Sequence, residues 1–426
     1  MDGQVQAPPR TVGFWGTALF PVNGMIGAGI FAMPAILVAA VGDFAPWLIL
    51  AGGLLFAPLI LVFAWLAARF DNSGGPVLYG QAAFGRFVGY QAGWMRYASA
   101  IVTVAANTHV MVAYLAALFP ALQPDYMRAG AVATIIAILT AINLFGMKKS
   151  VGALGAMTVL KLLPLALLIG SALFAGTNDV GFSLPRFSEV ETVVLLLYYA
   201  FMGFESVTLP AGEMKDPRRD VPRALLVTLG AVTLLYMAII WAFLAIGPGS
   251  GAEDNALAGS AEVAMGDFGA FAIVLAAAFS IAGNNFQGGV SLPRMTYGMA
   301  RQGMLPRWFA HVSPRWQTPS NSILFYGGAG IAFGLWEGFE ALALAGTLTR
   351  LFTYLVSAAA LPVLERRDGA LNRVHAVVAG LAFISTGWVA SHANPQSWLT
   401  FGGLFLLGTL FYFIAARQAP LDSAAS

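Results

Sequence analysis

The chain has 426 residues, of which 58% are hydrophobic and 10% are charged, whereas an average soluble domain has about 25% charged residues. Long uncharged runs recur along its whole length, so the composition excludes a soluble globular domain and predicts an all-α polytopic membrane protein. There are no cysteines, and the four histidines, His109, His311, His375 and His392, form no pair at helical spacing. We therefore expect no disulfide, metal site, cofactor or catalytic constellation, and nothing in the sequence indicates a nucleic-acid partner.

Twelve membrane spans are predicted if each crossing takes about 20 apolar residues. They run approximately over residues 12–40, 45–68, 88–118, 129–145, 151–175, 192–211, 224–246, 268–297, 320–336, 341–364, 374–391 and 398–415. The first of them is too long for a signal-peptide core, so we expect it to be retained. The predicted parts are an N-terminal tail (1–11), five spans (12–176), five further spans (177–364), two last spans (365–416) and a C-terminal tail (417–426).

The basic residues support this count, because they should gather in the loops on the cytoplasmic side. One set of alternate loops, with the two tails, holds 17 of the 22 Lys and Arg residues, whereas the opposite set holds only Arg128 and Arg186. We therefore predict a multi-pass protein of the cell membrane with both termini in the cytoplasm. The other three, Arg96, Lys161 and Arg350, fall inside spans, where ionisable groups are costly and usually mark function.

Two spans carry glycine-marked interruptions near their middles. The stretch 22–31 in the first span holds three glycines, and each glycine weakens a helix by about 1 kcal/mol relative to alanine. Such glycines also let two helices pack closely, and for the first span alone that is the simpler interpretation. The stretch 201–210 in the sixth span holds a glycine, a glutamate and a proline. Because five spans separate corresponding positions, the pattern predicts a five-plus-five inverted repeat with discontinuous first and sixth helices.

Interrupted helices in a bilayer leave bare N–H and C=O groups, which protein, water or a ligand must meet. The N-terminal ends of half-helices favour an anionic group, and unwound carbonyls favour a cation. An α-amino acid carries a carboxylate and an ammonium on one carbon and so meets both demands. The matched interruptions therefore predict a binding site for an amino acid.

Several motifs resemble those of the amino acid–polyamine–organocation (APC) permeases. The sixth-span sequence Phe201-Met202-Gly203-Phe204-Glu205-Ser206, with the charged loop 213–224, is the most specific match, and Gly27-Ala28-Gly29-Ile30-Phe31 resembles the first helix of that family. Residues 73–76 and 297–306 are similar to two of its other loop and helix-end motifs. The resemblance covers nearly the whole chain. It implies a LeuT-like fold and secondary active transport of amino acids by alternating access.

The resemblance also implies roles for individual residues. The substrate-binding residues would be Met25, Ile26, Gly27, Ala28, Gly29, Tyr199, Phe201, Met202, Gly203, Asn285 and Phe286. The amides around Ala28 and Gly29 would hold the carboxylate. The carbonyls of residues 25, 26, 201 and 202 would hold the ammonium, and Tyr199 would supply a pocket aromatic.

The eighth span contains an unusually polar stretch, Asn284-Asn285-Phe286-Gln287. These side chains either face the side-chain end of the substrate or form interhelical hydrogen bonds, which are worth about 0.6 kcal/mol each. Glycine, at 288 or 289, stands where some APC permeases keep a stacking tryptophan, which argues against a flat cationic side chain on the substrate.

Four ionisable residues are candidates for coupling or gating. Lys161 resembles the fifth-helix lysine of sodium-independent APC permeases, whose ammonium takes the region of a sodium ion; the alternative is a snorkelling lysine. Glu205 would accept hydrogen bonds from the unwound first helix or carry a coupling proton. Arg350 could pair with Glu205, gate the pocket or meet an acidic substrate group, and Arg96 could line the inner pathway. A snorkelling or paired structural role is an equal alternative for both arginines.

The sequence thus predicts a sodium-independent amino acid carrier, driven by protons or by exchange, that is not an enzyme. Its partners are the substrate, protons and the lipid bilayer. The rivals within transport are a polyamine or amine carrier and a sodium-coupled amino acid symporter. A membrane-embedded enzyme is a remote rival, because the chain has no cysteine, no histidine pair and no His-Glu-x-x-His motif. A channel would need a pore-loop filter, which the sequence does not show.

Overall fold

The computed structural model describes residues 12–70, 74–146, 151–208, 214–249 and 255–418, without the side chains of 151–154. Within these ranges the chain is helical, and the only β pairing is an isolated bridge between Val12 and Met214. The α-helices are α1 (Phe14–Met25), α2 (Gly29–Val41), α3 (Ala45–Arg69), α4 (Pro76–Phe84), α5 (Arg86–Leu118), α6 (Asp125–Leu144), α7 (Val151–Ala175), α8 (Phe187–Phe201), α9 (Pro217–Ile246), α10 (Ala256–Arg301), α11 (Ser320–Trp336), α12 (Phe339–Arg367), α13 (Arg373–Ser391) and α14 (Pro395–Ala416). Short 3-10 helices are η1 (Gly42–Phe44), η2 (Pro120–Leu122), η3 (Phe204–Thr208) and η6 (Arg307–Ala310).

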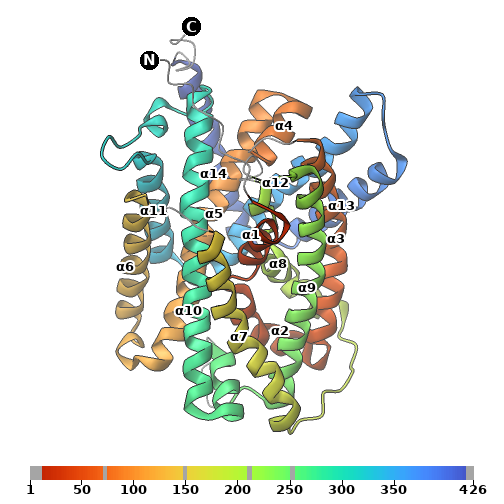
Figure 1. Cartoon of the computed structure of the whole chain (residues 1–426), viewed down its shortest axis with the longest axis vertical. Helices are drawn as coiled ribbons and strands as arrows, with labels where there is room; N and C mark the ends of the chain where they lie inside the picture. The colour runs from red at the N-terminus through yellow and green to blue at the C-terminus, as the bar shows by residue number, and fades with distance from the viewer. Residues whose placement is uncertain (1–11, 71–73, 147–150, 209–213, 250–254, 419–426) are drawn as a thin grey trace.

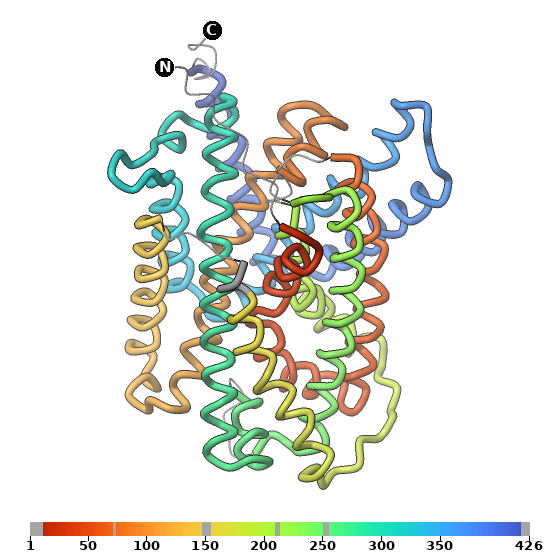
Figure 2. Tube along the Cα trace, in the orientation of Figure 1, coloured from red at the N-terminus to blue at the C-terminus, as the bar shows by residue number. Residues whose placement is uncertain are grey.

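The long helices run roughly side by side along the longest axis of the molecule (Figure 1). Helices α6 and α11 pack together at one edge of the bundle, and α3 and α13 pack together at the other. The short helices α1, α2 and α8 lie between these edges, as the trace in Figure 2 also shows. Helix α5 packs against both α10 and α12, so these three helices wall the region around the short ones.

Ten helical stretches of the described chain are long and apolar enough to cross a membrane. The sequence predicts twelve. One source of the difference is that Gly29–Arg69 is a single helical stretch that contains both α2 and α3. Another is that α11 is short, with 17 residues. The multi-pass character of the prediction is confirmed, and the exact count depends on how these elements cross.

Helix α4 falls between the second and third predicted spans, where the sequence predicted a loop over residues 69–76 and no element over 77–87. Gly75 has φ +49° and Pro76 is the first helical residue. Proline suits that position because its missing N–H would have no intrahelical partner there. The N-terminal tail 1–11, residues 419–426 of the C-terminal tail, and the predicted loop residues Lys148, Lys149 and 209–213 lie outside the described residues.

Both predicted interruptions are present in the backbone. Helix α1 ends at Met25, Ile26 has non-helical angles (φ −79°, ψ 82°), and α2 begins at Gly29. Helix α8 ends at Phe201, the chain is extended at Met202 (ψ 156°), and Gly203 has φ +102° before η3 begins.

The two interruptions lie against each other. A Cβ built on Gly24 would lie 2.6 Å from Ser206 Oγ, and one built on Gly203 would lie 2.6 Å from the Gly24 carbonyl carbon. The Ser206 hydroxyl donates to the Phe20 carbonyl at 2.9 Å. Further along, the amide of Lys215 donates to the carbonyl of Val12 at 2.9 Å. Close approach of two backbones therefore requires glycine at both breaks.

We predict that Gly203→Ala destabilises the protein by at least about 2 kcal/mol, because a positive φ alone costs an alanine roughly 1–2 kcal/mol and the new Cβ would strike Gly24. Thermal unfolding of the purified protein in detergent measures the effect. Gly230→Ala in α9 is the matched control, because a Cβ there meets nothing within 4 Å and alanine favours the helix by about 1 kcal/mol. Equal melting temperatures for the two variants would contradict the prediction.

Candidate functional site

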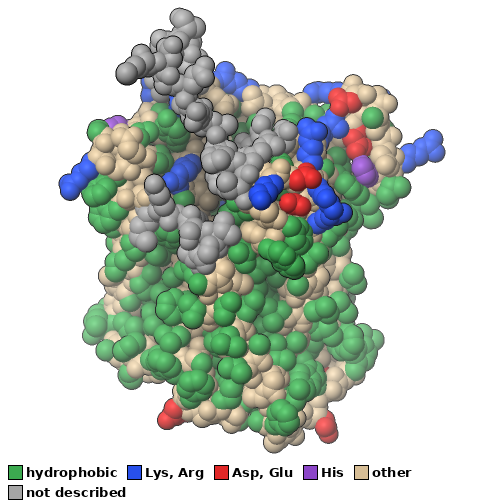
Figure 3. Space-filling model, viewed as in Figure 1, with side chains coloured by type: hydrophobic (Ala, Val, Ile, Leu, Met, Phe, Trp, Pro, Cys, Tyr) green, Lys and Arg blue, Asp and Glu red, His purple; other side chains and the backbone are tan. Residues whose placement is uncertain are grey.

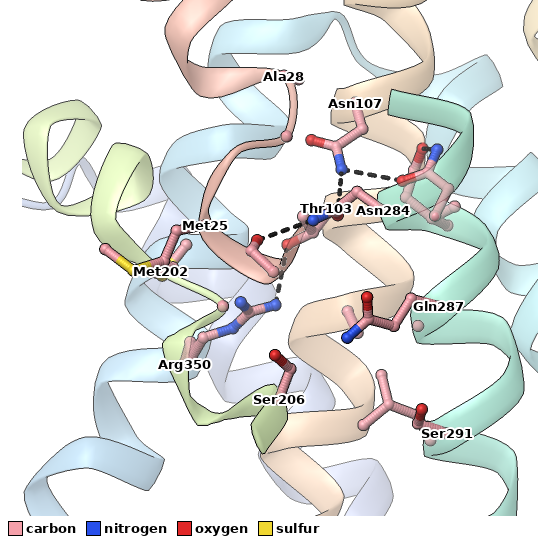
Figure 4. A pocket seen from close by; sticks show the side chains of 18 of the residues that line it. Met25, Ala28, Thr103, Asn107, Met202, Ser206, Asn284, Gln287, Ser291 and Arg350 are labelled. Atoms are coloured by element: carbon pink, nitrogen blue, oxygen red, sulfur yellow. Dashed lines mark hydrogen bonds between the residues drawn. The ribbon is translucent and has the colours of Figure 1, made fainter. Parts of the chain in front are cut away.

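A cavity of about 70 Å³ lies at the two interruptions, with α5, α10 and α12 around it (Figure 4). This is small compared with the roughly 300–1,000 Å³ of pockets for drug-sized ligands. The predicted binding residues that line it are Met25, Gly27, Ala28, Gly29, Tyr199, Met202, Gly203 and Asn285. Ile26, Phe201 and Phe286 are not among the lining residues. The predicted arginines, Arg96 and Arg350, line it as well, and Lys161 and Glu205 lie buried behind its walls.

The start of α2 presents unpaired backbone donors to the cavity. Ala28 and Gly29 line it, and in the described part of the chain no acceptor bonds the amides of Ala28, Gly29 or Ile30. The first N–H groups of a helix have no intrahelical partner, and the helix dipole adds partial positive charge there. This end of the cavity is therefore built to receive an anionic group.

The carbonyls of the first interruption are already bonded to the protein. The Met25 carbonyl accepts from the Tyr236 hydroxyl at 2.9 Å and from the Gly27 amide at 2.9 Å. The Ile26 carbonyl accepts from Lys161 Nζ at 3.0 Å and from Ser280 Oγ at 2.9 Å. Since a carbonyl has two lone pairs, neither of these oxygens has room for a substrate ammonium in this conformation.

Lys161 is fully buried and reaches the break from α7, so it does not snorkel. Its ammonium bonds the unwound carbonyl of Ile26 directly. Lys161 thus occupies the first interruption, where its charged form would repel a bound metal cation.

Glu205 forms ion pairs with two arginines from different helices. Its Oε1 lies 2.8 Å from Arg96 Nε on α5 and 3.6 Å from Arg350 Nη1 on α12. Its Oε2 accepts from the Gly203 amide at 3.1 Å and from the Tyr354 hydroxyl at 3.0 Å. The pairing of Arg350 with Glu205 was one of the sequence-based alternatives, and the carboxylate fixes the backbone of the second interruption rather than the first.

The polar stretch of α10 forms hydrogen bonds between helices. Asn107 Nδ2 on α5 donates to Asn285 Oδ1 at 2.9 Å, and its Oδ1 accepts from the Tyr199 hydroxyl. Asn284 Nδ2 donates to the Gly24 carbonyl at 2.8 Å. Gln287 lines the cavity, and its Oε1 accepts no hydrogen bond within the described residues. Asn284 and Asn285 thus form the interhelical hydrogen bonds of one sequence-based alternative, and contact with the substrate stays a prediction.

Sequence reasoning missed the polar face of α5. Arg96, Ser99, Thr103 and Asn107 follow one another at intervals of three or four residues, so they share one face of that helix. Arg96, Thr103 and Asn107 line the cavity, and the Ser99 hydroxyl accepts from Arg350 Nε at 2.9 Å. The signal was present as a polar stripe at helical spacing within an apolar span.

Comparison with known proteins gives matches over nearly the whole chain. The family model described as amino acid permease matches residues 12–420. An uncharacterised transporter of Mycobacterium tuberculosis is 30% identical over 330 residues, which cover 75% of this chain and 72% of that protein. A second uncharacterised transporter of the same species is 28% identical, covering 87% of this chain and 83% of that protein. The methylthioribose transporter of Bacillus subtilis is 26% identical, covering 97% and 94%.

We predict that Glu205→Gln costs about 3–5 kcal/mol of stability, because removing one partner of a buried ion pair leaves uncompensated charge. Arg69→Gln is the control, since its partner Asp368 is more than half exposed and such surface pairs contribute about 1 kcal/mol or less. Unfolding of both variants in detergent, followed by circular dichroism against denaturant, gives the comparison. Similar losses for the two would show that the buried carboxylate does not stabilise the fold.

Proposed function

Because the chain belongs to the amino acid permease family and is a membrane transporter rather than an enzyme, we propose that it moves amino acids across the cell membrane. Transport would be secondary active and proceed by alternating access. The observation that carries the proposal is the row of unbonded amides at the start of α2, which faces the cavity within the described chain. They suit the carboxylate that every amino acid possesses.

The ammonium of the substrate would lie at the end of α8. The last carbonyls of a helix lack intrahelical partners and carry partial negative charge. Helix α8 ends beside the start of α2, where a Cβ on Gly29 would lie 3.1 Å from the Cα of Ala200. Opposite ends of two helix dipoles therefore meet at one place, as a zwitterion requires. In this proposal Met202, which lines the cavity, takes the role that the resemblance gives to the carbonyls of Met25 and Ile26.

The proposed architecture is twelve spans in a five-plus-five inverted repeat followed by two further helices. In support, the two interruptions fall in helices that are five spans apart and touch each other at Gly24 and Gly203.

Hydrophobic side chains cover the middle of the face in Figure 3, and Lys and Arg side chains gather at the end where α4 lies. By the positive-inside tendency that end would face the cytoplasm, and both termini are proposed to lie on the same side of the membrane.

The proposed transport is independent of sodium. Lys161 places a positive charge on the Ile26 carbonyl, so the break already holds a cation of its own. Protons or exchange of one substrate for another would then drive transport.

An amine or polyamine carrier is the weaker alternative. No aspartate or glutamate is among the described residues that line the cavity, whereas a cationic substrate needs a counter-charge in a membrane interior. A neutral ligand, of the kind that the name of the Bacillus subtilis relative denotes, would leave the amides of α2 without an anion.

The proposal is tested with purified protein in proteoliposomes. We expect saturable uptake of at least one radiolabelled amino acid, accelerated by unlabelled amino acid inside the vesicle and unchanged when sodium is replaced by choline. Amines, methylthioribose and empty liposomes are the comparison arms. Uptake of an amine or of methylthioribose, with none of any amino acid, would overturn the proposal.

Lys161→Ala is predicted to lower uptake by about tenfold or more, because it removes a charged hydrogen bond worth about 1.5–3 kcal/mol from the unwound first helix. Ser280→Ala is the matched variant, since Ser280 bonds the same Ile26 carbonyl through a neutral hydroxyl. We expect it to lower uptake less than Lys161→Ala does. Initial rates at matched protein density give the answer, and equal losses would mean that the charge of Lys161 is unimportant.

A further inference from the structure

We propose that the substrate carries a second anionic group, so that the favoured substrates are acidic amino acids with a short side chain such as aspartate. Arg350, with Arg96 behind it, would receive the side-chain carboxylate. This inference rests on the proposed amino acid transport and narrows it to one substrate class.

The charge balance of the site is the first support. Two guanidinium groups, Arg96 and Arg350, contact one carboxylate, Glu205, and the side chains of all three are at least 92% buried. Arginine stays protonated in proteins, so the cluster keeps an excess positive charge whether or not Glu205 is ionised. An uncompensated buried charge is costly, and an anionic ligand would relieve that cost.

The second support is that the two arginines have N–H groups that are weakly bonded or have no hydrogen-bond partner. Arg350 bonds Ser99 through Nε and reaches Thr103 Oγ1 through Nη2 at 3.4 Å, and its Nη1 lies 3.6 Å from Glu205. These long contacts leave room for a better acceptor, because charged hydrogen bonds are usually about 2.7–2.9 Å. The Nη1 of Arg96 has no hydrogen-bond partner in the described structure, although Arg96 lines the cavity.

The placement of these groups suits a substrate with two acidic ends. In Figure 4, Arg350 and Ala28 lie at different ends of the cavity, and Gln287 and Ser291 form the wall opposite Arg350. The α-carboxylate would take the amides of α2, and the second carboxylate would take Arg350, with Gln287 as a neutral neighbour. The small cavity volume, about 70 Å³, favours a short side chain.

The decisive measurement compares an acid with its uncharged isostere. Binding of aspartate and of asparagine to the purified wild-type protein is measured by isothermal titration calorimetry, with succinate as a third ligand. We expect aspartate to bind at least about tenfold more tightly than asparagine, the ratio that one charged hydrogen bond supports. Tighter binding of asparagine than of aspartate would overturn the inference while leaving amino acid transport standing.

Arg350→Gln supplies the second readout, because it keeps a hydrogen-bonding side chain and removes the charge. The ratio of aspartate to asparagine affinity should fall by about tenfold, chiefly through weaker aspartate binding, and Arg350→Lys should restore part of it. A merely structural role would weaken both ligands equally, and that result would contradict the proposal. If Arg350→Gln fails to fold, the wild-type ratio alone decides.

Succinate separates the two proposals. It has two carboxylates and no ammonium, so we expect it to bind at least about tenfold more weakly than aspartate. Equal binding of succinate and aspartate would remove the amino acid proposal and leave the arginines as an anion site. Failure of all three ligands to bind would overturn the acidic-substrate inference.

Discussion

The bilayer tolerates unwound backbone only where protein or a cavity meets its polar groups, and this constraint governs the arrangement of the centre of the molecule. Where α1 stops at Met25, neighbouring helices supply the hydrogen bonds that the chain no longer supplies to itself. Tyr236 from α9, Lys161 from α7 and Asn284 from α10 each bond a carbonyl of the interruption. The break is therefore a feature of the whole bundle, because three separate helices must be in place to hold it.

These hydrogen bonds reach carbonyl groups of the break and not the amides that follow it. The carbonyls of Met25 and Ile26 are bonded to the protein, whereas Ala28 and Gly29, whose amides have no partner in the described chain, line the cavity. Arg96 and Arg350 also line the cavity, and no aspartate or glutamate is among its described lining residues. The proposed selectivity for anionic groups would then follow from which backbone groups the protein leaves unbonded, as much as from the side chains that line the cavity.

The positions of both interruptions could be predicted from sequence, because their cause is local. Gly203 has a positive φ that other residues rarely adopt, and Gly24 must admit another backbone. The partners of the break could not be predicted, because they depend on helix rotation. Nothing in the sequence shows that the Tyr236 hydroxyl reaches Met25.

The arginine cluster was only partly accessible from sequence. An arginine inside an apolar span indicates function or an ion pair, and the pairing of Arg350 with Glu205 was one of the alternatives that this raised. For Arg96, the closer partner of that carboxylate, a paired role was left open without a named partner, because the distance between two spans is a tertiary property. The helical spacing of Arg96, Ser99 and Thr103 on α5 was the unused clue, since a polar stripe shows which face of a span meets the interior.

The contacts between α1 and the segment that contains η3 have a mechanical consequence. Val12 bonds Lys215, Ser206 bonds Phe20, and the backbones of Gly24 and Gly203 touch. Fastened at several points along their length, these two pieces behave as one lever. Helix α2 lies beyond the interruption at Ile26 and is not part of that lever. A swing of the lever would move Gly203 and Ser206, which line the cavity, away from Ala28 and Gly29, separating the two surfaces that are proposed to hold the substrate.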